Sequence, residues 1–108
     1  LQCACETPID FTKTISMTMP LLSELSISNY LSSVAEKKPV PGGGAVAAIV
    51  GAEACALQAK VAIFSSNSDI KPIVESSIKT QKKLLDLAEK DSKAILALMN
   101  AGRKSKNY

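Results

Sequence analysis

Hydrophobic residues recur with the period of an α-helix in three stretches of the chain, and no stretch alternates with the period of a β-strand. Residues 1–20 show neither period, and we interpret them as a poorly defined leader. From Ser23 onward the pattern predicts a first helix over residues 24–37. This helix must end before Pro39, because the residue preceding a proline is disfavoured in the helical conformation. Its apolar stripe consists of Ile27, Tyr30, Leu31 and Val34.

The second predicted helix covers residues 45–65 and is apolar on nearly every side. A helix with this pattern is expected at the centre of a bundle. Glu53 and Lys60 lie seven residues apart in it, nearly on one helix face, and we interpret them as charges that pair across an interface. Small residues at every fourth position predict a face that another backbone approaches closely: Gly44, Ala48, Ala52 and Ala56.

A third helix is predicted from Pro72, which suits the first turn of a helix, to Ala101, with Gly102 as its stop. Since no strand pattern competes, the fold class is all-α. We expect an antiparallel helical bundle around a central, buried Ala/Gly-rich helix. Two pairs of opposite charge at i,i+4 spacing are predicted on the outer face of the third helix: Asp86 with Lys90, and Glu89 with Lys93.

The composition of the chain excludes several classes of function. With 108 residues, 46% of them hydrophobic and 21% charged, the chain has room for one folded domain. It contains no histidine, which excludes Ser-His-Asp and Cys-His catalysis and every zinc site that needs histidine, and no metal site is expected. Three cysteines, of which Cys55 lies in an apolar run, do not form a disulfide framework and indicate a reducing, cytoplasmic compartment.

Charge and aromatic content bear on the partners. A net charge of +3 without a basic block or interleaved aromatic residues argues against nucleic acid. Glu53 and Lys60 interrupt the one long apolar run, which argues against a membrane span. Two Phe, two Tyr and no Trp predict little buried area in one chain, so we expect a homo-oligomer. Residues 71–108 hold nine basic and four acidic side chains, which slightly favours an anionic ligand.

Two features carry candidate chemistry. Gly42, Gly43 and Gly44 precede the second helix, where backbone N–H groups can converge on an anion; a flexible turn between helices is the alternative interpretation. No strand precedes these glycines and no Gly-Lys-Ser/Thr ending follows them, so they are neither a dinucleotide fingerprint nor a P-loop. Asp91 lies on the apolar face of the third helix. Its carboxylate either serves a site or hydrogen-bonds a neighbouring helix, and spacing alone leaves both open.

The segment Pro39-Val40-Pro41-Gly42-Gly43-Gly44-Ala45, followed by an Ala/Gly-rich helix, resembles the Pro-Thr-Pro-Gly-Gly-Gly-Ser motif of the cyclodeaminase/cyclohydrolase family. This is the family of formimidoyltetrahydrofolate cyclodeaminase and methenyltetrahydrofolate cyclohydrolase. Asp91 with Ala94 and Met99 is similar to the family's Asp followed by Val-Met, and Arg103 and Lys106 fall where the family has Arg-Leu-Pro-Lys. The resemblance covers residues 21–107 and about the first half of the family's domain.

This resemblance implies a partial cyclodeaminase-like helical domain over residues 21–108 that dimerises through packed helices and binds a folate-type small molecule. The substrate would be a tetrahydrofolate derivative, with no metal or redox cofactor. The implied reaction is cyclodeamination of 5-formiminotetrahydrofolate or hydrolysis of 5,10-methenyltetrahydrofolate. The implied site has Asp91 as the catalytic residue, with substrate bound by Gly42, Gly43, Gly44, Arg103 and Lys106.

A function from another class stays open beside this one. A catalytically inactive, truncated helical dimer that serves as a binding or structural module would show the same helical pattern. An anion-binding helical module built on the three glycines is a weaker third hypothesis.

Overall fold

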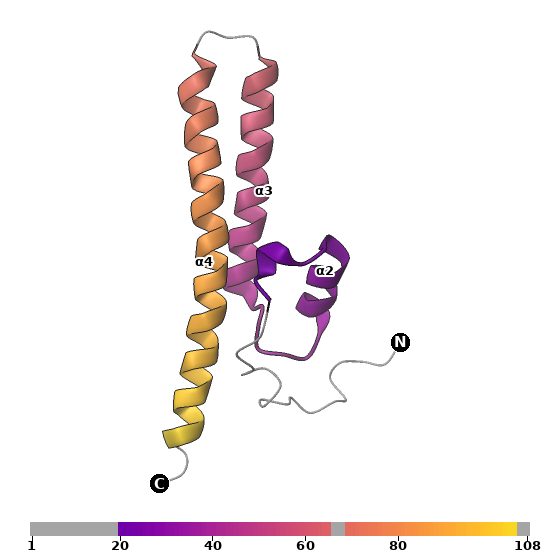
Figure 1. The fold of residues 1–108 in the computed structure, drawn as a ribbon, viewed down its shortest axis with the longest axis vertical. Helices are drawn as coiled ribbons and strands as arrows, with labels where there is room; N and C mark the ends of the chain where they lie inside the picture. Colours follow the sequence, from indigo (N-terminus) through magenta and orange to yellow (C-terminus); the bar gives the residue numbers. More distant parts are fainter. Residues whose placement is uncertain (1–19, 66–68, 106–108) are drawn as a thin grey trace.

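The computed structural model describes residues 20–65 and 69–105, with the side chains of residues 103–105 left undescribed. All regular structure in these residues is helical, which confirms the all-α class. A 3₁₀ turn, η2, spans Leu22–Glu24, and three α-helices follow: α2 (Ile27–Ala35), α3 (Gly43–Phe64) and α4 (Ile70–Ser105). In Figure 1, α3 and α4 lie side by side and antiparallel, and α2 lies beside the N-terminal half of α3.

The first helix is shorter than predicted. Ser26 is its N-cap, with an extended backbone and a side-chain oxygen that accepts a hydrogen bond from the Asn29 N–H at 3.1 Å. This cap fixes the start of α2 at Ile27, and the residues expected at its beginning form η2 instead. α2 ends at Ala35, before Pro39, as the proline rule requires.

α3 and α4 approach each other along a row of alanines. Ala45, Ala52, Ala59 and Ala62 are the buried residues of α3, and Ala88 of α4 is also buried. Ala45, Ala52 and Ala59 recur every seven residues, and Ala62 lies about one turn after Ala59. Of the face predicted from every fourth residue, Gly44 and Ala52 lie at the contact with α4, Ala48 is half-buried and Ala56 is exposed. An i+7 row drifts only about 20° around a helix, whereas an i+4 row drifts about 40° in the opposite sense and leaves the neighbouring helix sooner.

Gly51 adds to this close approach. A Cβ atom at this position would lie 3.1 Å from Leu84 Cδ1, so the absence of a side chain admits the leucine of α4. Small residues on α3 thus receive larger ones from α4, which is how two helices of unequal side-chain size pack closely.

α4 begins at Ile70 and holds Pro72 in its first turn, as predicted, but it runs through Gly102 to Ser105. The predicted stop at Gly102 is wrong. No glycine of the described residues has a positive φ, so Gly102 keeps helical geometry, at a cost of about 1 kcal/mol relative to alanine. The last turns of α4 extend past the start of α3 (Figure 1).

One of the two predicted charge pairs is present. Lys90 Nζ lies 2.9 Å from Asp86 Oδ2 on the exposed face of α4. Glu89 is not paired with Lys93; its Oε1 accepts a hydrogen bond from the Ser23 N–H at 3.1 Å. A 3₁₀ turn leaves its first N–H groups without partners inside the turn, and Glu89 satisfies one of them, which ties η2 to α4.

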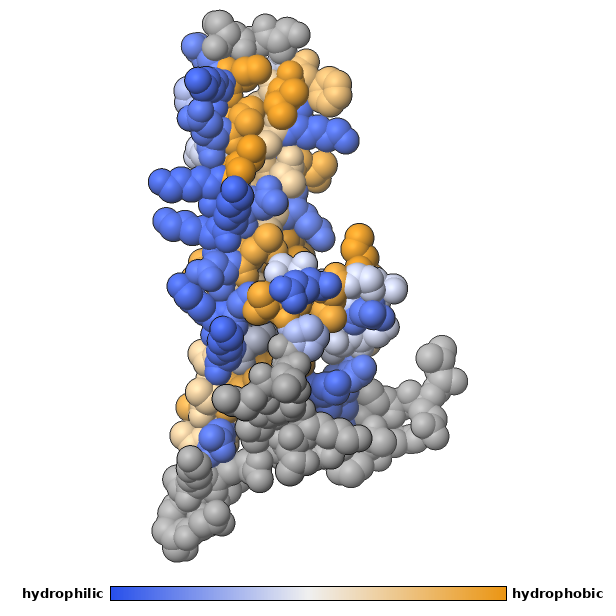
Figure 2. All heavy atoms as spheres, viewed as in Figure 1, coloured by the Kyte–Doolittle hydropathy of each residue, from blue (hydrophilic) through white to orange (hydrophobic). Residues whose placement is uncertain are grey.

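The buried core is small. The buried hydrophobic residues are valine or alanine, and many larger ones are exposed; Figure 2 shows hydrophobic side chains on the surface beside the hydrophilic edge of α4. The radius of gyration is 17.8 Å, against about 13 Å for a compact domain near this length. Among the described residues α3 is therefore not the central, buried helix that was predicted, because its buried residues are four alanines and most of its larger hydrophobic residues are exposed.

By length and composition alone α3 could also cross a membrane, and 17% of its most apolar window is buried in the chain. Core helices of soluble proteins meet the same criterion.

A larger side chain in the alanine row should destabilise the antiparallel pair of α3 and α4. Ala52 is 4% exposed, so we expect Ala52→Leu to lower the free energy of unfolding by about 1–3 kcal/mol, because the added atoms force α3 and α4 apart. Ala56, on an exposed position of the same helix, is the matched control, and Ala56→Leu should change stability by less than about 0.5 kcal/mol. Thermal denaturation followed by circular dichroism measures both. Equal effects would contradict the alanine-row packing.

Tyr30 of α2 reports on the contact between α2 and α3. Burial, and secondarily the negative charge of Glu53, raise the pKa of Tyr30 above its usual value of 10.0. The folded chain then holds a proton that the unfolded chain releases, so stability should fall as pH rises above about 10. Tyrosinate absorbance during a pH titration should show the raised pKa, and Glu53→Gln should lower it part of the way back. An unchanged titration in this variant would contradict the proximity of the two side chains.

Candidate functional site

The connection between α2 and α3 is held against α4. Val40 and Pro41 are buried, and the peptide bond between them is cis. Gly42 is the N-cap of α3 and makes no side-chain cap; its carbonyl accepts a hydrogen bond from the Val46 N–H at 3.1 Å. A Cβ atom on Gly42 would lie 3.3 Å from Ile95 Cδ1. Gly42 is therefore a closely packed helix start, and the alternative of a flexible turn between helices does not fit this residue.

Asp91 lies directly over this helix start. A Cβ atom on Gly44 would come within 2.8 Å of Asp91 Oδ1 and within 3.0 Å of Asp91 Oδ2 and Cγ, so only glycine admits the carboxyl group in its present position. Gly43, by contrast, faces open space. The structure thus brings together two features, Gly44 and Asp91, that the sequence pointed out separately.

The surroundings of the Asp91 carboxyl group are unusual for an acid. Oδ2 is buried and has no hydrogen-bond partner among the described residues. For Oδ2, the second interpretation of Asp91, a carboxylate that hydrogen-bonds the neighbouring helix, therefore does not hold among the described residues. The N-terminal end of α3 carries partial positive charge, and its first N–H groups have no acceptor within the helix, so the end of α3 favours a negative group at this place.

Ser92, the next residue, is a polar group that the sequence analysis missed. It is 8% exposed, and its hydroxyl oxygen has no hydrogen-bond partner among the described residues. Its neighbours one turn away are Ala88 and Leu96, so the same signal that identified Asp91, a polar residue on an apolar face, was available for Ser92. Ser92 lines a mostly apolar cavity of about 70 Å³ beside the buried Val40 and Pro41. That volume suits a few water molecules.

The two predicted basic ligands, Arg103 and Lys106, belong to the C-terminal end of the sequence. Arg103 is in the last turn of α4, but its side chain is among those that the structure leaves undescribed, and Lys106 lies outside the described residues. At 1.5 Å per residue, Arg103 is about 18 Å along the helix from Asp91. Only an extended ligand could contact both positions within one chain.

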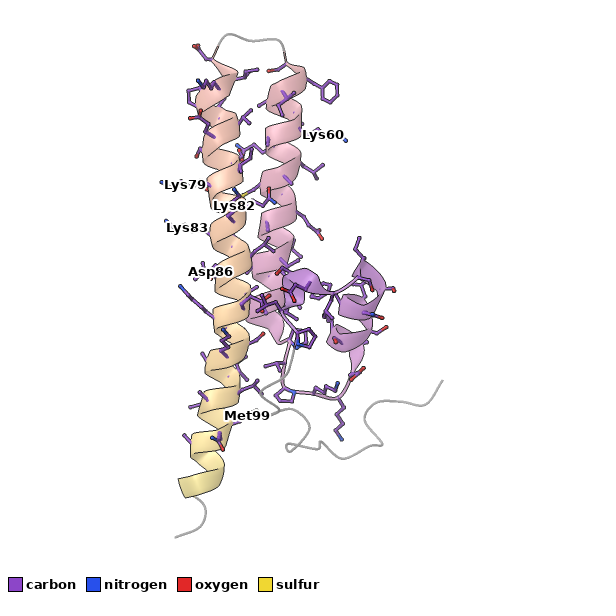
Figure 3. The ribbon with its side chains drawn as sticks, in the orientation of Figure 1. Lys60, Lys79, Lys82, Lys83, Asp86 and Met99 are labelled. Carbon is purple, nitrogen blue, oxygen red and sulfur yellow. The ribbon has the colours of Figure 1, made fainter. Side chains whose placement is uncertain are left out.

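The remaining reactive groups do not gather around this site. Cys55 is a free, partly buried thiol that lines a separate hollow between α3 and α4 with Gln58, Ser76, Ser77 and Thr80. The lysines labelled on α4 in Figure 3, Lys79, Lys82 and Lys83, lie on its exposed surface. Within residues 20–65 and 69–105, no group of three His, Cys, Asp or Glu side chains could hold a metal ion.

Comparison with known proteins gives one match. A family model described as formiminotransferase-cyclodeaminase matches residues 26–108, which include α2, α3, α4 and both parts of the Gly44–Asp91 contact. No curated protein and no solved structure matches the chain significantly.

The contact between Gly44 and Asp91 should appear as an energetic coupling. We expect Gly44→Ala to destabilise the chain by about 1–2 kcal/mol, because the new Cβ displaces the carboxyl group, whereas Gly43→Ala should be neutral or stabilising by up to about 1 kcal/mol. In an Asp91→Ala background the cost of Gly44→Ala should largely disappear. Urea unfolding of the double-mutant cycle gives the coupling, and a value near zero would contradict the contact.

Proposed function

The chain belongs to the formiminotransferase-cyclodeaminase family, and from this premise we propose that it carries out folate one-carbon chemistry at the Gly44–Asp91 contact. The observation that carries the proposal is the carboxyl group of Asp91, held against the start of α3 with Oδ2 out of water and without a partner. A polar atom buried in this way costs about 1–3 kcal/mol, a cost that a group awaiting a substrate explains.

Two reactions fit a single carboxyl group. In the cyclodeamination of 5-formiminotetrahydrofolate, N10 attacks the formimino carbon and a carbon–nitrogen bond forms. The imino nitrogen takes up the proton of N10 and a second proton from an acid, and its bond to the carbon breaks as ammonia leaves. In the hydrolysis of 5,10-methenyltetrahydrofolate, water adds to the methenyl carbon and gives up one proton to a base. The bond from this carbon to one ring nitrogen then breaks, and that nitrogen takes the second proton of the water as the formyl group forms. Asp91 would supply the proton in the first reaction and accept it in the second, and neither needs histidine.

The other predicted residues would bind the substrate. Backbone N–H groups at Gly42, Gly43 and Gly44 would contact an anionic or carbonyl oxygen, because the end of α3 attracts negative charge. Arg103 and Lys106 would hold the carboxylates of the folate tail, as bidentate or point-charge partners. The tetrahydrofolate derivative is then the substrate, and this scheme uses no metal or redox cofactor.

We further propose that the working form is a homo-oligomer in the cytoplasm. The large exposed hydrophobic residues and the small core support this proposal, since a second copy would cover surface that one chain leaves in water.

The same exposed surface favours a second candidate function. If the site needs groups that these residues do not supply, the chain would be an inactive helical dimer that serves as a binding or structural module. Activity distinguishes the two functions.

Asp91→Asn should lower kcat by about two to four orders of magnitude without loss of helical content by circular dichroism, because the amide cannot exchange the proton. The methenyl chromophore reports both reactions: near-ultraviolet absorbance falls during hydrolysis and rises during cyclodeamination. The control is Asp86→Asn, which removes an exposed, lysine-paired carboxylate from the same helix and should keep the wild-type rate.

Retention of the wild-type rate in Asp91→Asn would remove Asp91 from the mechanism. If the wild-type chain accelerates neither reaction over a protein-free control, the result favours the inactive helical module.

A further inference from the structure

α3 has a second apolar face on the side away from its buried alanine row. We call it the outer stripe, and it consists of Ala47, Val50, Ala54, Leu57, Val61 and Phe64. All six residues are exposed, and the exposed fractions of the four larger ones range from 57% for Val50 to 77% for Phe64. An apolar face of this length is uncommon on a chain that functions as a monomer.

The spacing along the outer stripe is that of a two-helix seam. Successive members are three, four, three, four and three residues apart, an average near 3.5, which keeps a stripe facing one partner helix along its whole length.

The order of small and large side chains selects an antiparallel partner. If a second α3 runs in the opposite direction, centred between Ala54 and Leu57, each layer combines similar total volumes. Ala54 then meets the partner's Leu57, Val50 meets the partner's Val61, and Ala47 meets the partner's Phe64. A parallel pair would place Phe64 on the partner's Phe64 and alanine on alanine, which leaves uneven gaps.

The charged residues beside the outer stripe also favour an antiparallel pair. Glu53 and Lys60 are exposed and flank the outer stripe on the same side, one residue before Ala54 and Val61. Figure 3 shows Lys60 pointing away from α4. In the antiparallel pair, Glu53 approaches the partner's Lys60 twice, once on each side of the two-fold axis, because residues at these flanking positions face each other between opposed helices.

We propose that the outer stripe of α3 binds the outer stripe of a second copy of this chain, antiparallel, with two reciprocal ion pairs between Glu53 and the partner's Lys60. This inference deepens the proposed homo-oligomer by assigning its surface and symmetry, and it does not depend on the reaction. Ile27 and Leu31 are also exposed, by 80% and 58%, and belong to α2, the helix beside the N-terminal half of α3.

The first test is the sedimentation of the purified 108-residue chain at micromolar concentration. The wild-type chain should be a dimer, and Leu57→Glu should be a monomer of unchanged helical content, because two carboxylates would meet two apolar side chains at the centre of the seam. Leu87→Glu is the matched control: Leu87 is 52% exposed on α4, outside the outer stripe, and this variant should remain a dimer.

The second test exchanges the charges of Glu53 and Lys60 and shows whether the two α3 helices are parallel or antiparallel. Glu53→Lys and Lys60→Glu should each raise the dimer dissociation constant by about tenfold or more, since two attractions become two repulsions, and the doubly exchanged chain should return to within about threefold of the wild-type value. In a parallel pair these residues would not face each other, and the double exchange would restore nothing.

Four outcomes would overturn the proposal: a monomeric wild-type chain, a Leu57→Glu variant that stays dimeric, no recovery in the double exchange, or a wild-type chain that sediments with phosphatidylcholine vesicles instead of dimerising. The absorbance assay is independent of these results. An inactive chain that forms the predicted dimer contradicts the enzyme and leaves this interface intact.

Discussion

Alanine and glycine on one face of α3 let the backbone of α4 approach closely, and the positions of both the core and the candidate site follow from this approach. Leu84 fits where Gly51 has no side chain, and Asp91 fits where Gly44 has none. Larger residues at either position would separate the helices or displace the leucine or carboxyl group. The small residues of α3 thus let α3 and α4 pack closely, and at the N-terminal end of α3 they leave room for the Asp91 carboxyl group.

The close approach of α3 and α4 leaves two buried polar atoms without hydrogen-bond partners, and this energetic cost suggests a function. It places Asp91 Oδ2 and the Ser92 hydroxyl among apolar neighbours without a hydrogen-bond partner in the described part of the chain. Two such groups on successive residues are more than packing alone would retain, because each could be replaced by an apolar side chain at little loss. Both lie near the connection that leads into α3 at Gly42, where α3 presents its positive end.

Because small residues form the contact face of α3, its larger hydrophobic residues lie on its exposed faces. With alanines against α4, the larger hydrophobic residues of α3 point away from the hairpin, and one chain buries little apolar area. The family match covers this unit of three helices and both sides of the site, so the exposed surface belongs to the family's domain. Pairing through the outer stripe would cover this surface and leave the Gly44–Asp91 contact on a different face of α3.

The sequence by itself determined the helical class, the three helical segments and the identity of Asp91 and the glycines as candidates, because helical periodicity, proline and glycine act over a few neighbouring residues. Local signals did not reveal that Ser26 would shorten α2 or that α4 would continue through Gly102, since competing caps and the cost of one glycine are of similar size. Only the tertiary structure decided which of the small residues on α3 face α4, that Asp91 meets Gly44, and that Ser92 is buried. These facts depend on the rotation and axial offset of one helix against another, which the pattern within a single helix does not contain.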